Sequence, residues 1–374
     1  MKHMAEIRND NGISTLYVDG QPFQAFAGEV HNSAAYDPER MEIEIWEKME
    51  QSNLNTLIVP VYWETLEPEE GKFDFTLVDA LIKQADKYKK KLILLWFGLW
   101  KNAESASLLY ERMAEAVSVV SGFLSVRRTG RGYAVGMESS GAFTFTIGPD
   151  IYVPYVSDIM KTYSRPDNPL LIPEVRKDAV TASYALYAFL HFHALCYAPF
   201  GVEDLWADQP SDLSAEVIDA LKLDPLSFNL SGTKETLGEV YRLLEEIRPL
   251  YLKYRGTEHM KCFLKQSDGE QGCYLKFKNY DIEIQYLPRT DGAPAAAGVV
   301  FELDENTFLI IGMMCSIRFH TKPGDHRRVD FLTKEAGTFH VGKWVCEQRQ
   351  NGDEKIVSVL YNMPGCFRIE TFKY

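Results

Sequence analysis

The chain has 374 residues, of which 46% are hydrophobic and 25% are charged, a composition that is ordinary for a soluble globular protein. Its formal net charge of −13 argues against nucleic acid or an anionic membrane as a partner, because the overall field repels phosphate. The 20 Tyr, 21 Phe and 6 Trp suit a neutral, sugar-like ligand, although most aromatic side chains in any protein belong to its core.

The N-terminal residues and the cysteines bear on the compartment. The chain begins MKHMAEIRNDNGIS, which lacks the apolar stretch of a signal peptide, and no long apolar run follows that would span a membrane. The six cysteines are Cys196, Cys262, Cys273, Cys315, Cys346 and Cys366. They form no CxxC pair and have no histidine at ligand spacing. We therefore expect free thiols, a cytoplasmic location, and neither a metal nor a cofactor.

Short apolar runs alternate with amphipathic stretches over residues 1–200, as in a parallel sheet or barrel with helical connections. The pattern predicts strands at 23–30, 55–61, 91–98, 149–156, 169–174 and 198–202. Helical periodicity predicts helices at 38–51, 76–89, 179–195 and 234–254. The expected fold class of this region is α/β.

From about residue 256 the sequence changes character. Short alternating runs follow one another, separated by Asp-Gly, Asn-Gly and Gly-Asp turn signals. This pattern is typical of a small antiparallel β domain with a sandwich-like arrangement. We place the boundary within 254–268, which predicts an N-terminal domain at 1–255 and a C-terminal β domain at 265–374.

The segment from Trp63 to Phe75, WETLEPEEGKFDF, follows the second predicted strand and precedes a predicted helix. An acidic and aromatic loop at the carboxyl end of a barrel strand is where active-site groups lie. A solvated loop with a capping aspartate explains the residues of this segment equally well.

Three motifs in the N-terminal region resemble those of clan A glycoside hydrolases, especially β-galactosidases of families 35 and 42. The first is W-x-x-x-E-P-x-x-G-x-[FY]-[DN]-F, which begins at Trp63. The second is GEVHNS at 28–33, and the third is NAE at 102–104. This resemblance implies a (β/α)8 (TIM) barrel. It also implies retaining hydrolysis of terminal β-galactosides, with a galactoside or a related oligosaccharide as substrate.

The resemblance resumes at GPDIY, 148–152, and continues through NPLLIPE, 168–174. In the family, a glutamate that ends the seventh strand is the catalytic nucleophile, and Glu174 is the position that matches. A carboxylate there can attack the anomeric carbon and form a glycosyl-enzyme intermediate. The structural alternative is that Glu174 caps the following helix.

Several residues near predicted strand ends are candidates for contacts with a sugar. Asn102 and Glu104 match the family's sugar-binding motif, although a helix N-terminus with glutamate in its first turn would use the same residues. Trp63 and Trp100 are expected either to stack on a sugar face or to pack loops above the sheet.

Glu29 and Tyr152 complete the set of candidate binding residues. Glu29 is expected to bridge the sugar and the backbone, or to make a purely structural hydrogen bond. Tyr152 is a candidate for lining a subsite, as are Tyr155 and Glu203. Glu67 is expected to be structural, in a salt bridge beneath its loop.

The stretch that should carry the catalytic acid/base is missing. In the family this residue is a glutamate in an Asn-Glu pair after the fourth strand, and no such stretch is present. Only 48 positions separate Asn102 from Asp150, whereas one βα unit takes about 30 residues. We expect a helix at 106–123, a strand at 142–147 and loop between them. Glu138 is the one substitute for the acid/base, and a surface-loop glutamate is its alternative.

Two hypotheses remain open. The chain is either a glycosidase impaired by loss of an internal segment, or a shortened relative that binds sugar without cleaving it. About six strands would leave the barrel open, where closure takes about eight. We therefore expect lowered stability or association of copies into a homo-oligomer. The C-terminal region, around residues 337–354, resembles the small β domain that follows the barrel in one bacterial branch of the family, which implies a packing role.

Overall fold

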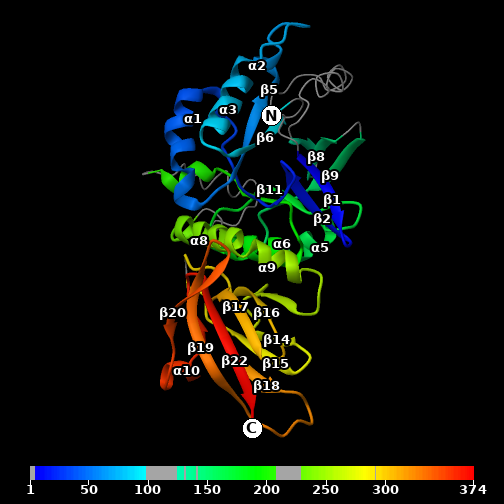
Figure 1. The fold of residues 1–374 in the computed structure, drawn as a ribbon. Coiled ribbons are helices and arrows are strands. Elements are labelled where there is room, and N and C mark those ends of the chain that lie inside the picture. Colours follow the sequence, from blue (N-terminus) through cyan, green and yellow to red (C-terminus); the bar gives the residue numbers. More distant parts are fainter. Residues whose placement is uncertain (1–4, 98–123, 130–131, 140–141, 208–228, 291) are drawn as a thin grey trace. The chain divides into compact units, whose positions relative to one another are not determined.

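The computed structural model describes residues 5–97, 124–129, 132–139, 142–207, 229–290 and 292–374 (Figure 1), with the backbone alone for 96–97 and 124–145. The chain divides into two compact units. The first comprises Met1–Tyr152, Asp158–Lys177 and His193–Asp224, and the second comprises Val153–Ser157, Asp178–Phe192 and Pro225–Tyr374. The structural units thus interleave along the chain, and the domain limits 1–255 and 265–374 stay a prediction about sequence modules.

The first unit begins with a small antiparallel sheet of β1 (Ala5–Asp10), β2 (Ile13–Val18) and β3 (Gln21–Phe23). Asn11-Gly12 and Asp19-Gly20 connect these strands, and all four residues have positive φ, as the two-residue turns of β-hairpins require. These hairpins were not predicted, although both dipeptides are the strongest short-range signal for them.

The central sheet of the first unit has the order β10-β11-β12-β4-β5-β6-β7-β8-β9. Its strands are β4 (Ala25–Glu29), β5 (Thr56–Tyr62), β6 (Lys91–Phe97), β7 (Leu124–Thr129), β8 (Gly132–Ser139), β9 (Ala142–Gly148), β10 (Asp150–Ile151), β11 (Leu171–Val175) and β12 (Cys196–Pro199). The pairs from β10 through to β7 are parallel, whereas β7, β8 and β9 pair antiparallel. Strands β4, β5, β11 and β12 are buried along their whole length, as expected of parallel strands covered on both faces.

The strands at the two ends of this order are consecutive in the chain, because Pro149 alone separates β9 from β10. The backbone N–H of Ile147 donates to Asn168 Oδ1 at 2.7 Å, and Asn168 Nδ2 donates back to the Ile147 carbonyl at 3.1 Å. The segment that ends β9 therefore lies against the segment that precedes β11.

The expectation of about six strands with loop over most of 124–141 was wrong. Residues 124–129 and 132–139 form β7 and β8, which join the expected strand β9 in an antiparallel meander. Gly, Ser and Arg weaken the alternation of these segments, so that pairing with neighbours decides their structure. The predicted helix at 106–123 lies outside the described residues.

Most other elements of this unit were predicted from periodicity. The strands at 23–30, 55–61, 91–98 and 169–174 correspond to β4, β5, β6 and β11. The strand expected at 149–156 is limited to β10, because α5 begins at Val156. The strand expected at 198–202 ends at Pro199, because Gly201 turns the chain with a φ of +63°.

Helices cover the sheet near β5 and β6 (Figure 1). The predicted helix 38–51 consists of α1 (Pro38–Glu44) and the 3-10 helix η2 (Trp46–Ser52), and 76–89 corresponds to α3 (Thr76–Lys87). Trp46 Nε1 donates to Gln84 Oε1 at 3.0 Å and joins the two segments. The shorter helices are η1 (Ala34–Tyr36), α2 (Trp63–Leu66), α5 (Val156–Tyr163) and η3 (Val202–Trp206).

The second unit combines helices with two antiparallel sheets. Its helices are α6 (Val180–His191), α8 (Thr233–Glu246), α9 (Arg248–Tyr254) and α10 (Asp353–Ile356). The predicted helix 234–254 is divided at Ile247, because Pro249 lies in the first turn of α9 and has no N–H to continue α8. Helix α6 is buried from Val180 to Leu190, and Ser183 Oγ donates to the Ala295 carbonyl at 2.7 Å.

The sheets of the second unit have the orders β13-β16-β17-β22-β19-β20 and β14-β15-β18-β21. Their strands are β13 (Met260–Leu264), β14 (Gly272–Lys276), β15 (Tyr280–Tyr286), β16 (Ala297–Glu302), β17 (Thr307–Met313), β18 (Cys315–Thr321), β19 (Val329–His340), β20 (Lys343–Arg349), β21 (Val359–Leu360) and β22 (Gly365–Lys373). One buried cluster draws apolar side chains from both sheets, among them Phe308 and Tyr280. The predicted antiparallel β structure is thus confirmed.

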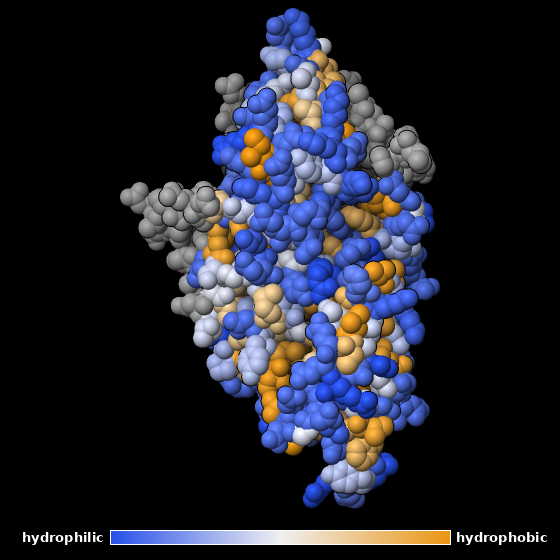
Figure 2. All heavy atoms as spheres, turned by 60° about the vertical axis from the view of Figure 1, so that its left-hand side comes forward, coloured by the Kyte–Doolittle hydropathy of each residue, from blue (hydrophilic) through white to orange (hydrophobic). Residues whose placement is uncertain are grey.

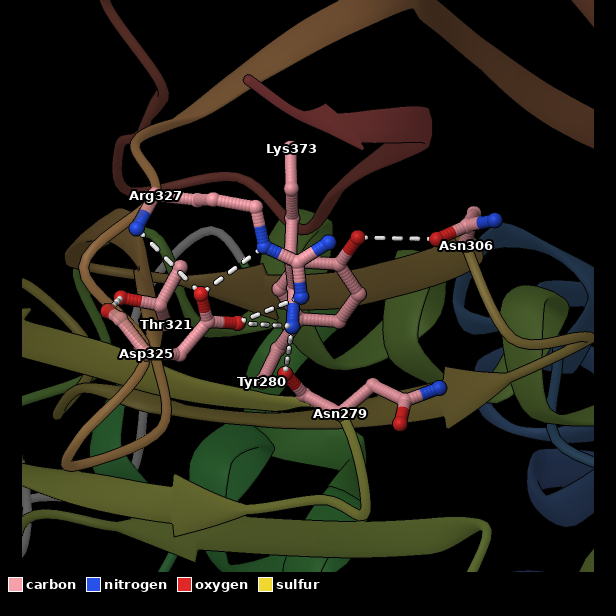
Figure 3. A network of polar contacts seen from close by, with 7 residues as sticks. All are labelled: Asn279, Tyr280, Asn306, Thr321, Asp325, Arg327 and Lys373. Atoms are coloured by element: carbon pink, nitrogen blue, oxygen red, sulfur yellow. Dashed lines mark hydrogen bonds and ion pairs between the residues drawn. The ribbon is translucent and has the colours of Figure 1, made fainter.

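A polar network fastens the C-terminal strand (Figure 3). Lys373 Nζ donates to the Asn279 carbonyl at 2.9 Å and to Asp325 Oδ2 at 3.1 Å, and it lies 4.6 Å from the centre of the Tyr280 ring. Arg327 Nε donates to Asp325 Oδ1 at 2.9 Å. Hydrogen bonds from Arg327 and Lys373 hold the pKa of Asp325 well below its usual range. The network ties β22 to the turn before β15.

The cysteines and the surface agree with the sequence where the structure describes them. All six cysteines are free thiols. Hydrophilic side chains cover most of the face in Figure 2, with apolar side chains in small separate patches. None of the helices in the described ranges is long and apolar enough to cross a bilayer.

Lys334 on β19 is fully buried, and its ammonium donates to the carbonyls of Glu354 and Val357 while facing the Phe367 ring. Burial lowers its pKa from 10.5 to about 8. Above pH about 8 the unfolded chain therefore binds more protons than the folded one, so stability rises with pH.

We predict that the free energy of unfolding of the wild type, relative to Lys334→Met, increases between about pH 7 and pH 9.5, by at most about 3 kcal/mol at about 1.36 kcal/mol per pKa unit. Urea denaturation at both pH values measures the difference. A difference that does not change with pH would contradict the prediction.

Candidate active site

Acidic residues meet at the carboxyl ends of neighbouring parallel strands. Asp150 on β10 pairs in register with Glu174 on β11, and Glu29 at the end of β4 forms a parallel bridge with Phe200, just after β12. In-register residues of parallel strands lie side by side, with the strands about 4.8 Å apart. The strand ends thus bring three carboxylates, of Glu29, Asp150 and Glu174, to the same edge of the sheet, where the charges of all three act on Tyr152.

Tyr152 links this group of carboxylates. Its phenol donates to Glu174 Oε1 at 2.9 Å. Burial, followed by the charges of Glu174, Glu29 and Asp150, raises the pKa of Tyr152 well above its usual value. The phenol therefore stays protonated at neutral pH and remains a hydrogen-bond donor. Glu174 is 8% exposed, so this donor fixes one oxygen of a buried carboxylate.

Glu29 is fully buried, and neither of its carboxylate oxygens is accessible to solvent. Its charge contributes to the raised pKa values of Tyr152 and of the buried thiol of Cys196. This burial favours the structural alternative that the sequence left open for Glu29, while its contact with a sugar stays a prediction.

A second polar group lies at the same strand ends and was not foreseen as a unit. Asp204 Oδ2 forms an ion pair with Lys177 Nζ and a hydrogen bond of 2.9 Å with His31 Nε2. Desolvation raises the pKa of Asp204, but hydrogen bonds from His31 and Lys177 outweigh it and hold the pKa well below the usual range. The sequence signal that could have identified this group was a charged or titratable residue soon after each of three buried strands.

Residues next to Asp204 in the chain also contact His31 or lie close to Lys177. The Glu203 carboxylate accepts the backbone N–H of His31 at 2.8 Å, and burial raises the pKa of Glu203. Gly201 has a φ of +63°, and a Cβ there would lie 2.5 Å from His31 Cε1 and 2.9 Å from Lys177 Nζ. A side chain at position 201 would therefore collide with the polar group.

The acidic loop after β5 is stabilised by its own carboxylates. Glu67 is 7% exposed, and its Oε1 accepts the backbone N–H of Gly71 at 2.6 Å. Asp74 Oδ1 accepts the N–H of Thr76 at 2.8 Å, at the start of α3. Trp63 is half-buried at the start of α2, on the same loop. The loop's acidic residues 67 and 74 thus have structural contacts with backbone N–H groups, while the salt bridge expected for Glu67 stays a prediction.

The structure places only part of the predicted site. Glu29, Tyr152 and Glu174 come together, and Trp63 follows β5 within the same unit. Trp100, Asn102 and Glu104 lie outside the described residues, and the side chain of Glu138, on β8, is not described. Within the described ranges, no group of three or more His, Cys, Asp or Glu side chains is arranged to hold a metal ion.

Two family models match the chain. Residues 35–95 match the family described as beta-galactosidase (glycoside hydrolase 42), and residues 237–359 match a domain of unknown function, DUF5597. The first match confirms the predicted resemblance to clan A glycosidases over the segment that contains the acidic loop. No curated protein matches the chain in sequence.

Several solved structures of glycoside hydrolases are distantly similar. A family 39 glycoside hydrolase from Bacteroides cellulosilyticus WH2 is 11% identical, with a TM-score of 0.45, over 96% of this chain and 84% of that one. An endo-beta-1,4-mannanase from Thermotoga petrophila is 12% identical, with a TM-score of 0.38, over 80% and 96%. Endo-glycoceramidase II from Rhodococcus sp. is 10% identical, with a TM-score of 0.38, over 94% and 98%.

The contact between Glu203 and His31 generates a stability prediction. Because burial raises the pKa of Glu203, the folded chain holds this proton more tightly than the unfolded chain, and stability falls as pH rises above the ordinary value of 4.5. Glu203→Gln keeps an acceptor for the His31 N–H and removes this fall. Glu203→Ala removes the acceptor and costs about 1–3 kcal/mol.

Urea denaturation of the wild type and both variants at about pH 5 and pH 8 tests this pair of outcomes. Glu203→Gln should gain stability relative to the wild type at the higher pH. Equal stabilities of the Gln and Ala variants would show that the hydrogen bond to His31 contributes nothing.

Proposed function

We propose that this chain, which matches the β-galactosidase family over residues 35–95, is a retaining glycoside hydrolase for terminal β-galactosides, with Glu174 as its nucleophile and impaired acid catalysis. The observation that carries the proposal is the hydrogen bond of 2.9 Å from Tyr152 to Glu174 at the carboxyl edge of the parallel strands. This edge is where barrel enzymes hold their catalytic groups.

The contact with Tyr152 gives Glu174 a defined orientation. With Oε1 held by the phenol, Oε2 is the oxygen that attacks the anomeric carbon. A bond forms between Oε2 and that carbon while the bond to the leaving-group oxygen breaks, and the aglycone departs with the electron pair. Water then attacks the same carbon and breaks its bond to Oε2, which releases galactose and regenerates the carboxylate. The proton that water loses passes to solvent, and the aglycone anion takes its proton from solvent. Tyr152 remains neutral throughout, because burial and three nearby carboxylates raise its pKa.

The turn of the chain at Pro149 supports a closed barrel. In this proposal the β9–β10 segment acts as one bent strand that pairs with β8 at one end and with β11 at the other. The meander β7-β8-β9 then occupies the space of the missing βα units. Such closure removes the exposed edges that an open sheet would present. It needs no partner subunit.

Substrate contacts form the finer part of the proposal. Trp63 and Trp100 would stack on the sugar, and Asn102 and Glu104 would hydrogen-bond its hydroxyls, as the sequence motifs suggest. Position 174 lies at the same edge of the sheet from which the loop of Trp63 leaves, since β5 and β11 run parallel in one sheet.

A retaining glycosidase also needs a second carboxyl group, about 5–5.5 Å from the nucleophile, to protonate the leaving group and later activate water. The family's acid/base motif is absent from the sequence, and loss of a general acid typically costs about 10²–10⁴-fold in rate. We therefore expect slow turnover that depends strongly on the leaving group.

We predict that Glu174 becomes covalently labelled by 2,4-dinitrophenyl 2-deoxy-2-fluoro-β-galactoside, whose leaving group needs no proton. Intact-protein mass spectrometry should show one added fluorogalactosyl group, which peptide mapping places on Glu174. The Glu174→Gln variant should remain unlabelled, and Glu67→Gln serves as the control because Glu67 contacts its own loop. Saturable galactoside binding that Glu174→Gln leaves unchanged, with no labelling, would instead favour the sugar-binding alternative.

We further predict that azide accelerates turnover of 2,4-dinitrophenyl β-galactoside, because a small anion attacks the glycosyl-enzyme without general-base help. The product should be β-galactosyl azide, identified by NMR, at a rate at least about 10-fold above that with water alone. Rapid hydrolysis of an alkyl galactoside without azide would show that an acid/base residue is present after all.

A further inference from the structure

We propose that the strand-end clamp, formed by His31, Lys177 and Asp204, is a positioning device that sets the placement of the nucleophile Glu174. The inference rests on the proposed function and extends it, since none of the three residues was assigned a role there. A single atom, Asp204 Oδ2, receives both the Lys177 ammonium and His31 Nε2.

The clamp joins the three loops that surround the nucleophile. Lys177 lies three residues after Glu174 on the chain that leaves β11, and His31 lies two residues after Glu29 on the chain that leaves β4. Asp204 belongs to η3, which follows the strand β12 between them. The contact between Asp204 and His31 spans 173 residues of sequence. A displacement of any one of these loops therefore strains its contacts with the other two.

Burial makes the clamp stiff. The side chains of Lys177 and Asp204 are 6% and 5% exposed, whereas that of His31 is 32% exposed. A buried ion pair that loses one partner leaves an uncompensated charge in a poorly solvating environment. Loss of either Lys177 or Asp204 alone would therefore be costly. His31 is the member of the clamp that is exposed to solvent.

The chain around the clamp leaves its side chains little space to move. A Cβ on Gly201 would lie 2.5 Å from the His31 ring and 2.9 Å from Lys177 Nζ, and Glu203 holds the His31 backbone N–H from the other direction. The His31 ring also meets the edge of Phe200, with 5.1 Å between ring centres. These contacts leave the imidazole little freedom to move away from Asp204.

A positioning role differs from simple stabilisation in what it changes. If the clamp only stabilises the fold, its loss lowers the unfolding temperature and leaves the chemical step of the folded fraction unchanged. If it positions Glu174, its loss slows the chemical step while substrate binding is retained. A displacement of about 1 Å at a reacting group costs about 10²-fold in rate.

The test uses the full chain and 2,4-dinitrophenyl 2-deoxy-2-fluoro-β-galactoside as the probe. For Asp204→Asn and Gly201→Ala, we expect the maximal rate of labelling of Glu174 to fall about 10–100-fold, with the half-saturating concentration within about two-fold of the wild type. The double variant Lys177→Met/Asp204→Asn removes both buried charges. It should recover folding without recovering the labelling rate.

Asp325→Asn is the matched control, because Asp325 also takes two cations, Arg327 and Lys373, but belongs to the second unit. It should leave the labelling rate unchanged. Wild-type labelling rates in both Asp204→Asn and Gly201→Ala would overturn the proposal. So would an equal loss in Asp325→Asn, since the effect would then be general. Should Asp204→Asn fail to fold, Gly201→Ala and the double variant decide.

Amide hydrogen exchange separates failure of the clamp from failure of the proposed function. In Asp204→Asn and in the double variant, exchange should become faster in 174–178 and 28–32 together, because both segments lose their common anchor. An unlabelled wild type would reject the glycosidase proposal. Faster exchange in both segments would then still support the mechanical coupling, and unchanged exchange would overturn it.

Discussion

The parallel pairing of β10, β11, β12 and β4 is the constraint on which the candidate site depends. Register places Asp150 beside Glu174, and Glu29 ends a strand two positions away in the same sheet, so three carboxylates gather at one edge. Such a concentration of negative charge needs donors and cations close by. Tyr152 donates a hydrogen bond to Glu174, and Lys177 supplies a buried positive charge to Asp204. The contacts that would serve chemistry at this edge are therefore also contacts that stabilise its packing.

The central sheet also shows how a short stretch of chain adds several strands. The residues between β6 and β11 are too few for the expected βα units, yet β7, β8 and β9 add three strands, two of them through short antiparallel connections. An antiparallel hairpin needs only a few residues, whereas a parallel crossover needs a dozen or more. A meander is thus the shortest way to fill the sheet before the chain returns at Pro149.

The sequence predicted Glu174 and Tyr152 as candidates because each lies in a family-like motif at the end of an apolar run, and the structure joins them at 2.9 Å. It did not identify the clamp. His31, Lys177 and Asp204 belong to three separate segments, and nothing in the local sequence marks charged residues as partners. Their association follows from strand order, which places β12 between β11 and β4. Residues that lie within a family-like motif could be predicted as candidates. Residues that are related only by their place at the edge of the sheet could not.

The sequence by itself determined local elements such as the buried strands β5 and β11 and the alternating strands of the second unit. These follow from side-chain periodicity and backbone chemistry within a few residues. Tertiary structure alone decided that 124–129 and 132–139 form strands, that β9 and β10 lie at opposite ends of the sheet order, and that Asp204 contacts His31. The physical reason is that hydrogen-bond partners and buried charges are satisfied by distant segments, whose proximity exists only once the sheet has formed.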